Sequence, residues 1–199
     1  DDEIAMGMKE KTRAKIMTFG FNEGAVVKII NFENKFDDKE TTGVSFKLEY
    51  GGSFVPIFLK NVFGRSHAYA AAVGATVGII YNMNIVEIAE SLSSNYRPAK
   101  RRMNLIQGIK NTHIIDDSYN ASPLSMQQAV ETLRDLKTER KIAVLGDMLE
   151  LGEHSREAHE EIGRLAAKSV DFLVTVGQNG KVIASAAEKA GLLPGELAA

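Results

Sequence analysis

The sequence predicts an α/β protein with a β-rich first half and a second half built on a parallel sheet. Residues 25–60 are rich in β-branched and aromatic residues, which favours strands. After residue 100, short apolar stretches alternate with amphipathic helical stretches, which is typical of parallel strands joined by helical crossovers. The stretch between the halves contains Pro98 and little apolar material, so a boundary is expected within residues 95–102.

The composition excludes several classes of protein. The chain has 199 residues, 44% of them apolar and 25% charged, values that are ordinary for a globular protein and too apolar for a disordered one. Its 24 basic and 26 acidic residues give a net charge of −2, so no basic excess predicts nucleic-acid binding. Without cysteine there is no disulfide and no thiolate chemistry. The longest run free of both charged and strongly polar residues, residues 68–81, is shorter than the roughly 20 residues of a membrane span.

The first half is expected to hold a helix, several strands and two further helices. Gly20 ends the first strand, Gly51-Gly52 is typical of a hairpin turn, and Asn84 is a helix N-cap. The expected elements are a helix at 4–11, strands at 15–20, 26–30, 44–50 and 54–59, and helices at 64–80 and from residue 85.

The second half begins with a strand-like stretch, residues 105–116, broken by Gly108 and Asn111. Ser122 followed by Pro123 predicts a helix start, with serine as N-cap and proline at the first helical position. The remaining expected elements are strands at 141–146 and 171–177 and helices at 155–167 and 181–190.

One polar stretch, residues 116–123, follows an apolar strand and is a candidate ligand site. Sites in parallel sheets gather at the carboxyl ends of the strands. Successive strand residues point to opposite faces, so only one of Asp116 and Asp117 is expected to face a given ligand. A carboxylate there can accept the hydroxyls of a ribose, and the amide of Asn120 can pair with an adenine edge. Asp117, as a carboxylate at the rim of the sheet and outside the core, is expected to matter little for folding. A simple polar turn is the alternative to a ligand site.

A second polar stretch, residues 145–155, leads into a helix that contains His159. Acids and two histidines together suggest a metal site, but His154 and His159 are five residues apart and therefore do not share one helical face. A solvated loop or a loop that contacts substrate is the better interpretation, and no metal site is expected.

Several catalytic motifs are absent. There is no G-x-x-x-x-G-K-[ST] phosphate loop, no G-x-G-x-x-G after a strand and no G-x-S-x-G nucleophile turn. The residues alone thus indicate an α/β domain with a polar site at a strand end and no self-contained catalytic apparatus.

The two polar stretches also carry a resemblance to a known family. Residues 116–126, then residues 143–152 and His159, resemble the Mur ligases, and residues 63–67 and Arg102-Met103 fall in the expected order. The resemblance implies that residues 1–100 are the latter part of an ATP-binding central domain whose phosphate loop lies upstream. Residues 101–199 would be most of a Rossmann-like C-terminal domain. The chain, which starts without methionine, would thus be a truncated piece.

The resemblance assigns roles to four residues, all in ATP binding. Arg102 matches an arginine that contacts ATP phosphate, Asp117 the aspartate that holds the ribose, and Asn120 an asparagine near adenine. In the family pattern, two asparagines stand at the start of the helix expected at 64–80, and His67 occupies the position of the first. A nucleotide contact by His67 is therefore only weakly implied, and a helix-start capping role is the alternative. Ala70 and Ser122 also replace asparagines of the family pattern.

The implied activity is that of an ADP-forming carboxylate–amine ligase of peptidoglycan precursor synthesis, located in the cytoplasm. ATP, with Mg²⁺, would activate UDP-N-acetylmuramoyl-tripeptide as an acyl phosphate that the amine of D-alanyl-D-alanine then attacks. No catalytic residue is assigned within this chain, and the isolated chain is expected to be inactive. Two alternatives stay open: a Mur-type ligase for another amino acid, and a non-catalytic module that binds a nucleotide or a partner.

Overall fold

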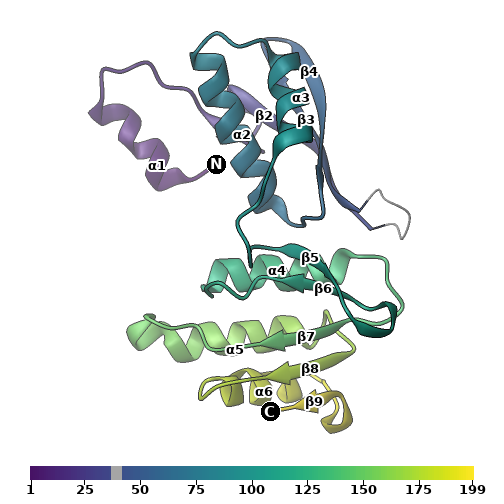
Figure 1. Ribbon diagram of the computed structural model, residues 1–199. Coiled ribbons are helices and arrows are strands. Elements are labelled where there is room, and N and C mark those ends of the chain that lie inside the picture. The colour runs from purple at the N-terminus through teal and green to yellow at the C-terminus, as the bar shows by residue number, and fades with distance from the viewer. Residues whose placement is uncertain (37–41) are drawn as a thin grey trace. The chain divides into compact units, whose positions relative to one another are not determined.

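The computed structural model describes residues 1–36 and 42–199, and these form two compact units (Figure 1). Unit 1 comprises Asp1–Ala99 and unit 2 comprises Lys100–Ala199, a division that falls inside the expected boundary segment. Within the described residues, no helix is long and apolar enough to cross a membrane.

Unit 1 is built on a four-stranded sheet in the order β1-β2-β3-β4. Its strands are β1 (Phe19–Gly20), β2 (Val27–Lys35), β3 (Gly43–Tyr50) and β4 (Ser53–Lys60), of which only the β1–β2 pair is parallel. The predicted hairpin is confirmed: Gly51 and Gly52 have φ of +58° and +79°, and both central residues of a type I′ turn need positive φ.

Two helices, α2 (Arg65–Ile80) and α3 (Ile85–Asn95), pack on this sheet. The α2 face toward the sheet is alanine-rich, which lets the helix lie close to the strands. Asn84 caps α3 as predicted, its Oδ1 accepting the N–H of Val86 at 2.8 Å. The buried side chains shared by sheet and helices include Val44, Phe46, Leu48, Ile57, Leu59, Ala68, Ala71, Ala72 and Ala75.

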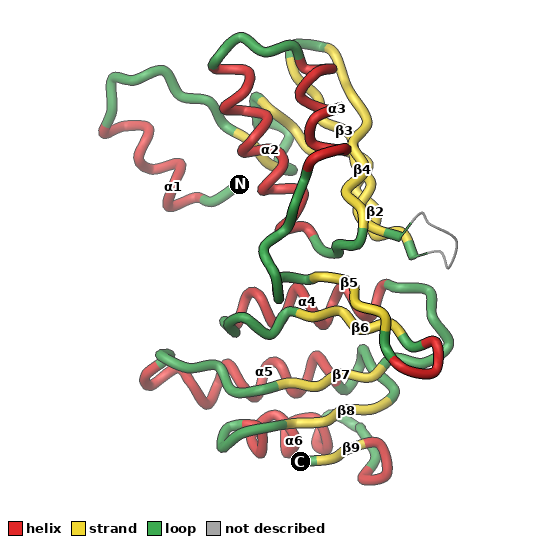
Figure 2. The backbone as a smooth tube through the Cα atoms, in the orientation of Figure 1, coloured by secondary structure: helices red, strands yellow, loops and turns green. Residues whose placement is uncertain are grey.

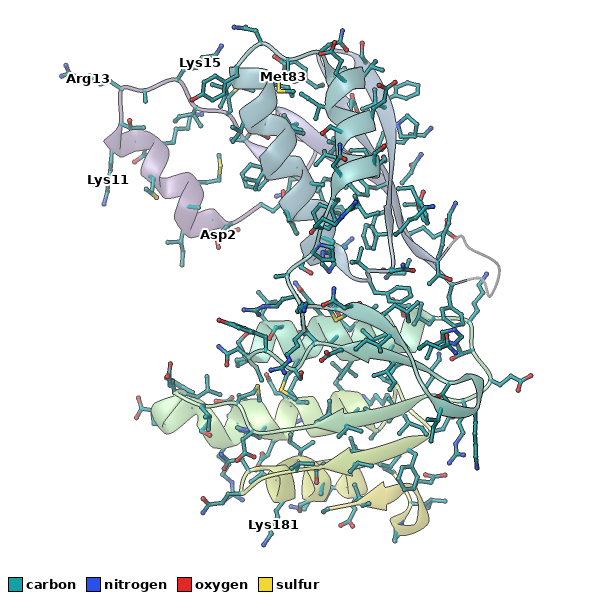
Figure 3. The ribbon with its side chains drawn as sticks, viewed as in Figure 1. Asp2, Lys11, Arg13, Lys15, Met83 and Lys181 are labelled. Atoms are coloured by element: carbon teal, nitrogen blue, oxygen red, sulfur yellow. The ribbon has the colours of Figure 1, made fainter. Side chains whose placement is uncertain are left out.

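The first residues of unit 1 contribute little to this core. Asp2 caps the short helix α1 (Glu3–Gly7), which continues into η1 (Met8–Lys11), and neither element has a buried residue. Beyond η1 the basic side chains of Arg13 and Lys15 project outward (Figure 3). The strand predicted at residues 15–20 is confined to β1, the two residues that pair with β2.

Unit 2 begins with a hairpin and continues with a parallel sheet. The stretch 105–116 was expected as one broken strand; instead it reverses at Gly108, so that β5 (Asn104–Gln107) and β6 (His113–Asp116) pair antiparallel across the turn η2 (Ile109–Asn111). The parallel sheet has the order β7-β8-β9, with β7 (Ile142–Leu145), β8 (Phe172–Thr175) and β9 (Leu197–Ala198). Strand β9, which follows η4 (Pro194–Glu196), was not predicted.

Three helices cover one side of the unit 2 strands (Figure 2). They are α4 (Pro123–Asp135), α5 (Ser155–Ala166), which follows η3 (Gly152–His154), and α6 (Gly180–Lys189). Their apolar faces, with Ile162 and Ile183 at the centre, bury Leu173 of β8. Strands β6, β7 and β8 run in the same direction, so their carboxyl ends share one edge of unit 2 (Figure 1).

Candidate functional site

The hairpin brings Arg102 close to Asp117. Met103, which follows Arg102, is hydrogen-bonded to Asp117 although the two lie 14 positions apart in the sequence. Asn104 pairs with Asp116, so the residue before β5 and the residue after β6 are neighbours. Asp117 Oδ1 accepts the N–H of Met103 at 3.1 Å, and the Arg102 guanidinium lies 4.4 Å from the ring centroid of Tyr119. A cation, a carboxylate and an exposed aromatic ring thus form one cluster at the carboxyl end of β6.

Asp117 is less solvated than a rim carboxylate would be. Burial raises the pKa of Asp117 above its usual range, and nearby Asp116 adds to this, while the Met103 N–H and the Arg102 charge act in the opposite direction. The expectation that this carboxylate matters little for folding therefore needs correction. Its bond to Met103, a buried residue, ties the two ends of the hairpin together.

The backbone on both sides of Arg102 is in the left-handed region. Arg101 has φ of +61° and Met103 has φ of +48°, values that side chains other than glycine and asparagine adopt rarely. Such conformations persist where surrounding contacts impose them, and they concentrate at functional sites. Here the contacts are the Met103–Asp117 bond and a bond from the Tyr119 N–H to the Arg101 carbonyl at 3.2 Å.

Asn120 and Asp116 take part in local turn bonds. Asn120 Oδ1 accepts the N–H of Ala121 at 2.9 Å, which directs the amide group while its NH₂ carries two further donors. Asp116 Oδ1 accepts the N–H of Ser118 at 3.1 Å, so the polar-turn alternative describes Asp116 well. The following helix start is as predicted, with a capping box between Ser122 and Ser125.

His67 lies in unit 1, whereas the other three predicted residues lie in unit 2. Its side chain is 5% exposed, and Nδ1 is 2.7 Å from the hydroxyl of Tyr96. Burial raises the pKa of that tyrosine. The N-cap of α2 is Gly64, three residues earlier, so His67 is not the capping residue. A contact with nucleotide remains a prediction for all four residues.

Sequence reasoning missed the part that Asp147 plays in the second polar stretch. Its carboxylate accepts three backbone N–H groups at the start of α6, from Gln178 at 3.0 Å, Asn179 at 2.9 Å and Gly180 at 3.0 Å. Gly177 has φ of +101°, and a Cβ there would lie 2.5 Å from Asp147 Oδ1. The glycine two residues after β8 was the available signal, because it opens the turn that receives this carboxylate.

His159 is fully buried and both of its ring nitrogens have protein partners. Nε2 accepts the N–H of Met148 at 2.9 Å, and Nδ1 donates to the Ser155 carbonyl at 2.6 Å. Since both nitrogens are used in this way, His159 holds the loop rather than a metal. Across the residues with described positions, no group of three or more His, Asp or Glu is placed to hold a metal ion.

Comparison with known proteins agrees with this architecture. Residues 101–198 match the family model described as "Mur ligase, glutamate ligase domain". The chain belongs to the Mur ligase family. The UDP-N-acetylmuramoyl-tripeptide–D-alanyl-D-alanine ligase of Bacillus subtilis is 33% identical over 138 residues, which are 68% of this chain and 29% of that protein.

Solved structures give the same result for the fold. MurF from Acinetobacter baumannii has a TM-score of 0.76 at 29% identity, covering 99% of this chain and 40% of that one. MurF from Thermotoga maritima, solved in complex with ADP, also has a TM-score of 0.76, at 24% identity, covering 92% and 40%. These matches confirm the predicted α/β class and the family resemblance. The chain spans only about a quarter to a third of the length of the curated relatives it matches.

Proposed function

We propose that this Mur ligase chain is part of an enzyme that joins D-alanyl-D-alanine to UDP-N-acetylmuramoyl-tripeptide at the expense of ATP. The observation that carries the proposal is the match to relatives of that name, one of them 34% identical over 173 residues and 81% of this chain. Residues 1–100 would belong to the ATP-binding central domain and residues 101–199 to the C-terminal domain. Such ligases use UDP-linked substrates and ATP, so the proposed location is the cytoplasm.

The Arg102–Asp117 cluster suits one side of a nucleotide site. Arg102 would hold ATP phosphate through its guanidinium, since arginine matches phosphate geometry with several donors. Asp117 retains acceptor positions for ribose hydroxyls, and Asn120 retains two amide donors for adenine. The Arg102 guanidinium lies over the Tyr119 ring, and this cation–π contact would help to hold it in place. Nucleotide contact by His67 is a separate proposal for unit 1, where its bond to Tyr96 fixes the ring.

The reaction itself would need residues that this sequence does not contain. Transfer of the γ-phosphoryl group to the peptide carboxylate gives an acyl phosphate and ADP, and attack by the amine then releases phosphate. Positioning and charge stabilisation dominate phosphoryl transfer, and these 199 residues include no phosphate loop to supply them. Mg²⁺ would enter with the ATP phosphates, whose charge it offsets.

A chimaera tests the proposal. These 199 residues would replace the matching segment of the Bacillus subtilis relative, and ADP release would be measured with UDP-N-acetylmuramoyl-tripeptide and each of several amines. Release that depends on D-alanyl-D-alanine supports the proposal. Dependence on another amino acid would identify a different Mur ligase, and a folded chimaera that binds ATP without turnover would favour the non-catalytic alternative.

A further inference from the structure

The loop between β7 and α5, residues 146–152, is held in place at two successive positions. Asp147 is bonded to three N–H groups at the start of α6, and the Met148 N–H is bonded to the buried ring of His159. The Met148 side chain is itself buried at 1% exposure. These contacts come from two different helices, so the loop has a fixed starting direction as it leaves the sheet.

The next two residues are presented outward from these anchors. Leu149 is 69% exposed, and Glu150 is exposed with φ of +63°, a left-handed conformation that a glutamate adopts only where its surroundings impose it. Within the described part of the chain, Glu150 has no hydrogen bond or ion pair. A strained, exposed carboxylate on an anchored loop has no evident structural task, which makes a ligand contact the natural hypothesis.

The position of this loop relative to the Arg102–Asp117 cluster indicates which ligand. The loop follows β7 and the cluster follows β6, and the carboxyl ends of both strands lie at the same edge of unit 2 (Figure 1). Ligands of open α/β sheets bind along that edge. The amine that attacks the activated carboxylate has to approach the nucleotide, so it would occupy the same edge.

We infer that Glu150 binds the ammonium group of the incoming amino substrate, with Leu149 offering apolar contact to its methyl groups. This inference rests on the proposed function and extends it to the amine. A carboxylate is the side chain that recognises an ammonium through charge-assisted hydrogen bonds. Asp147 and His159 act as positioning residues, because they fix the loop without reaching the substrate.

The test is the kinetics of Glu150→Gln in the chimaera described above, with Glu153→Gln as matched control. Glu153 is an exposed glutamate in η3, directly after this loop, with a side chain 90% exposed. We expect Glu150→Gln to raise the KM for D-alanyl-D-alanine at least tenfold, with the KM for ATP and the melting temperature unchanged. Glu153→Gln should leave all three unchanged.

A second variant separates strain from binding. Glu150→Gly removes the carboxylate and also suits the positive φ, so it should raise the KM for the amine while the melting temperature rises or stays constant. An active chimaera whose KM for the amine is unaffected by Glu150→Gln, or equally affected by Glu153→Gln, would overturn this inference and leave the proposed function standing. A folded chimaera without ligase product would overturn both.

Discussion

Replacing Asp117 by asparagine and by alanine should separate its structural task from its ligand task. Asparagine keeps an oxygen that can accept the Met103 N–H, whereas alanine leaves that N–H of a buried residue unpaired. An unsatisfied buried donor costs about 1–3 kcal/mol. Asp117→Ala should therefore lower the free energy of unfolding by that amount, and Asp117→Asn should keep it near the wild-type value at acidic pH.

The pH dependence of this difference has a definite sign. Burial raises the folded-state pKa of Asp117 above its unfolded value, so the folded protein disfavours the ionised form. The resulting destabilisation is absent below the ordinary aspartate range, grows as pH rises through the raised pKa, and then stays constant. Asparagine carries no charge at any pH, so Asp117→Asn should become the more stable protein as pH increases toward neutrality. Urea unfolding of both variants at several pH values measures this.

ATP use should respond differently from stability. If Asp117 binds the ribose, both variants lose a hydrogen bond to a charged group, which is worth about 1.5–3 kcal/mol, or roughly 10- to 150-fold in affinity. The readout is the KM for ATP in the chimaera, with Asp116→Asn as control, because Asp116 bonds only its own turn at Ser118 in the described structure. The reasoning fails if Asp117→Asn leaves the KM for ATP unchanged, or if Asp116→Asn raises it instead.

Three further outcomes are expected. His159→Ala should lower the free energy of unfolding by about 2–4 kcal/mol in denaturant titration, because it leaves a cavity and the unpaired Met148 N–H, while the exposed His154→Ala should change it by less than about 0.5 kcal/mol. Gly163→Ala should lower the free energy of unfolding by about 1–3 kcal/mol, since its Cβ would lie 2.3 Å from the Ile183 carbonyl oxygen. Gly146→Ala, with open space around the added Cβ, should leave it unchanged in the same denaturant titration. The 199-residue chain alone should release no ADP from ATP in a coupled assay, and release abolished by a substitution within it would contradict the assignment of the phosphate loop elsewhere.

Local chemistry accounts for what the sequence predicted well. The Gly51-Gly52 turn, the Asn84 cap and the Ser122-Pro123 helix start each depend on residues adjacent in the chain, and all three are found where expected. Elements that depend on distant partners were missed or misjudged. Strand β9 exists because Leu197 pairs with Leu173, and nothing in its own two residues favours a strand.

In the candidate site, too, local features could be predicted and features that depend on distant contacts could not. Residue type and position after a strand were enough to suggest Asn120 and one of Asp116 and Asp117 as candidates. The family resemblance singled out Asp117 and added Arg102 and His67. The left-handed backbone of Arg101 and Met103 could not be predicted, because neither residue type prefers that region. It results from tertiary bonds that reach across the hairpin.

The two strand-end aspartates show why position alone does not identify a ligand-binding carboxylate. An ionised carboxylate has about four acceptor positions. Asp147 uses three of them for backbone N–H groups at the start of α6, so it acts as a ligand to the protein's own helix. In the described structure, Asp117 uses one acceptor position, for the Met103 N–H. Its side chain is partly exposed and lies near the Arg102 guanidinium. Of Asp117 and Asp147, it is Asp117 that keeps the acceptor capacity for two ribose hydroxyls, and this difference depends on folding contacts 14 and about 30 residues away in the sequence.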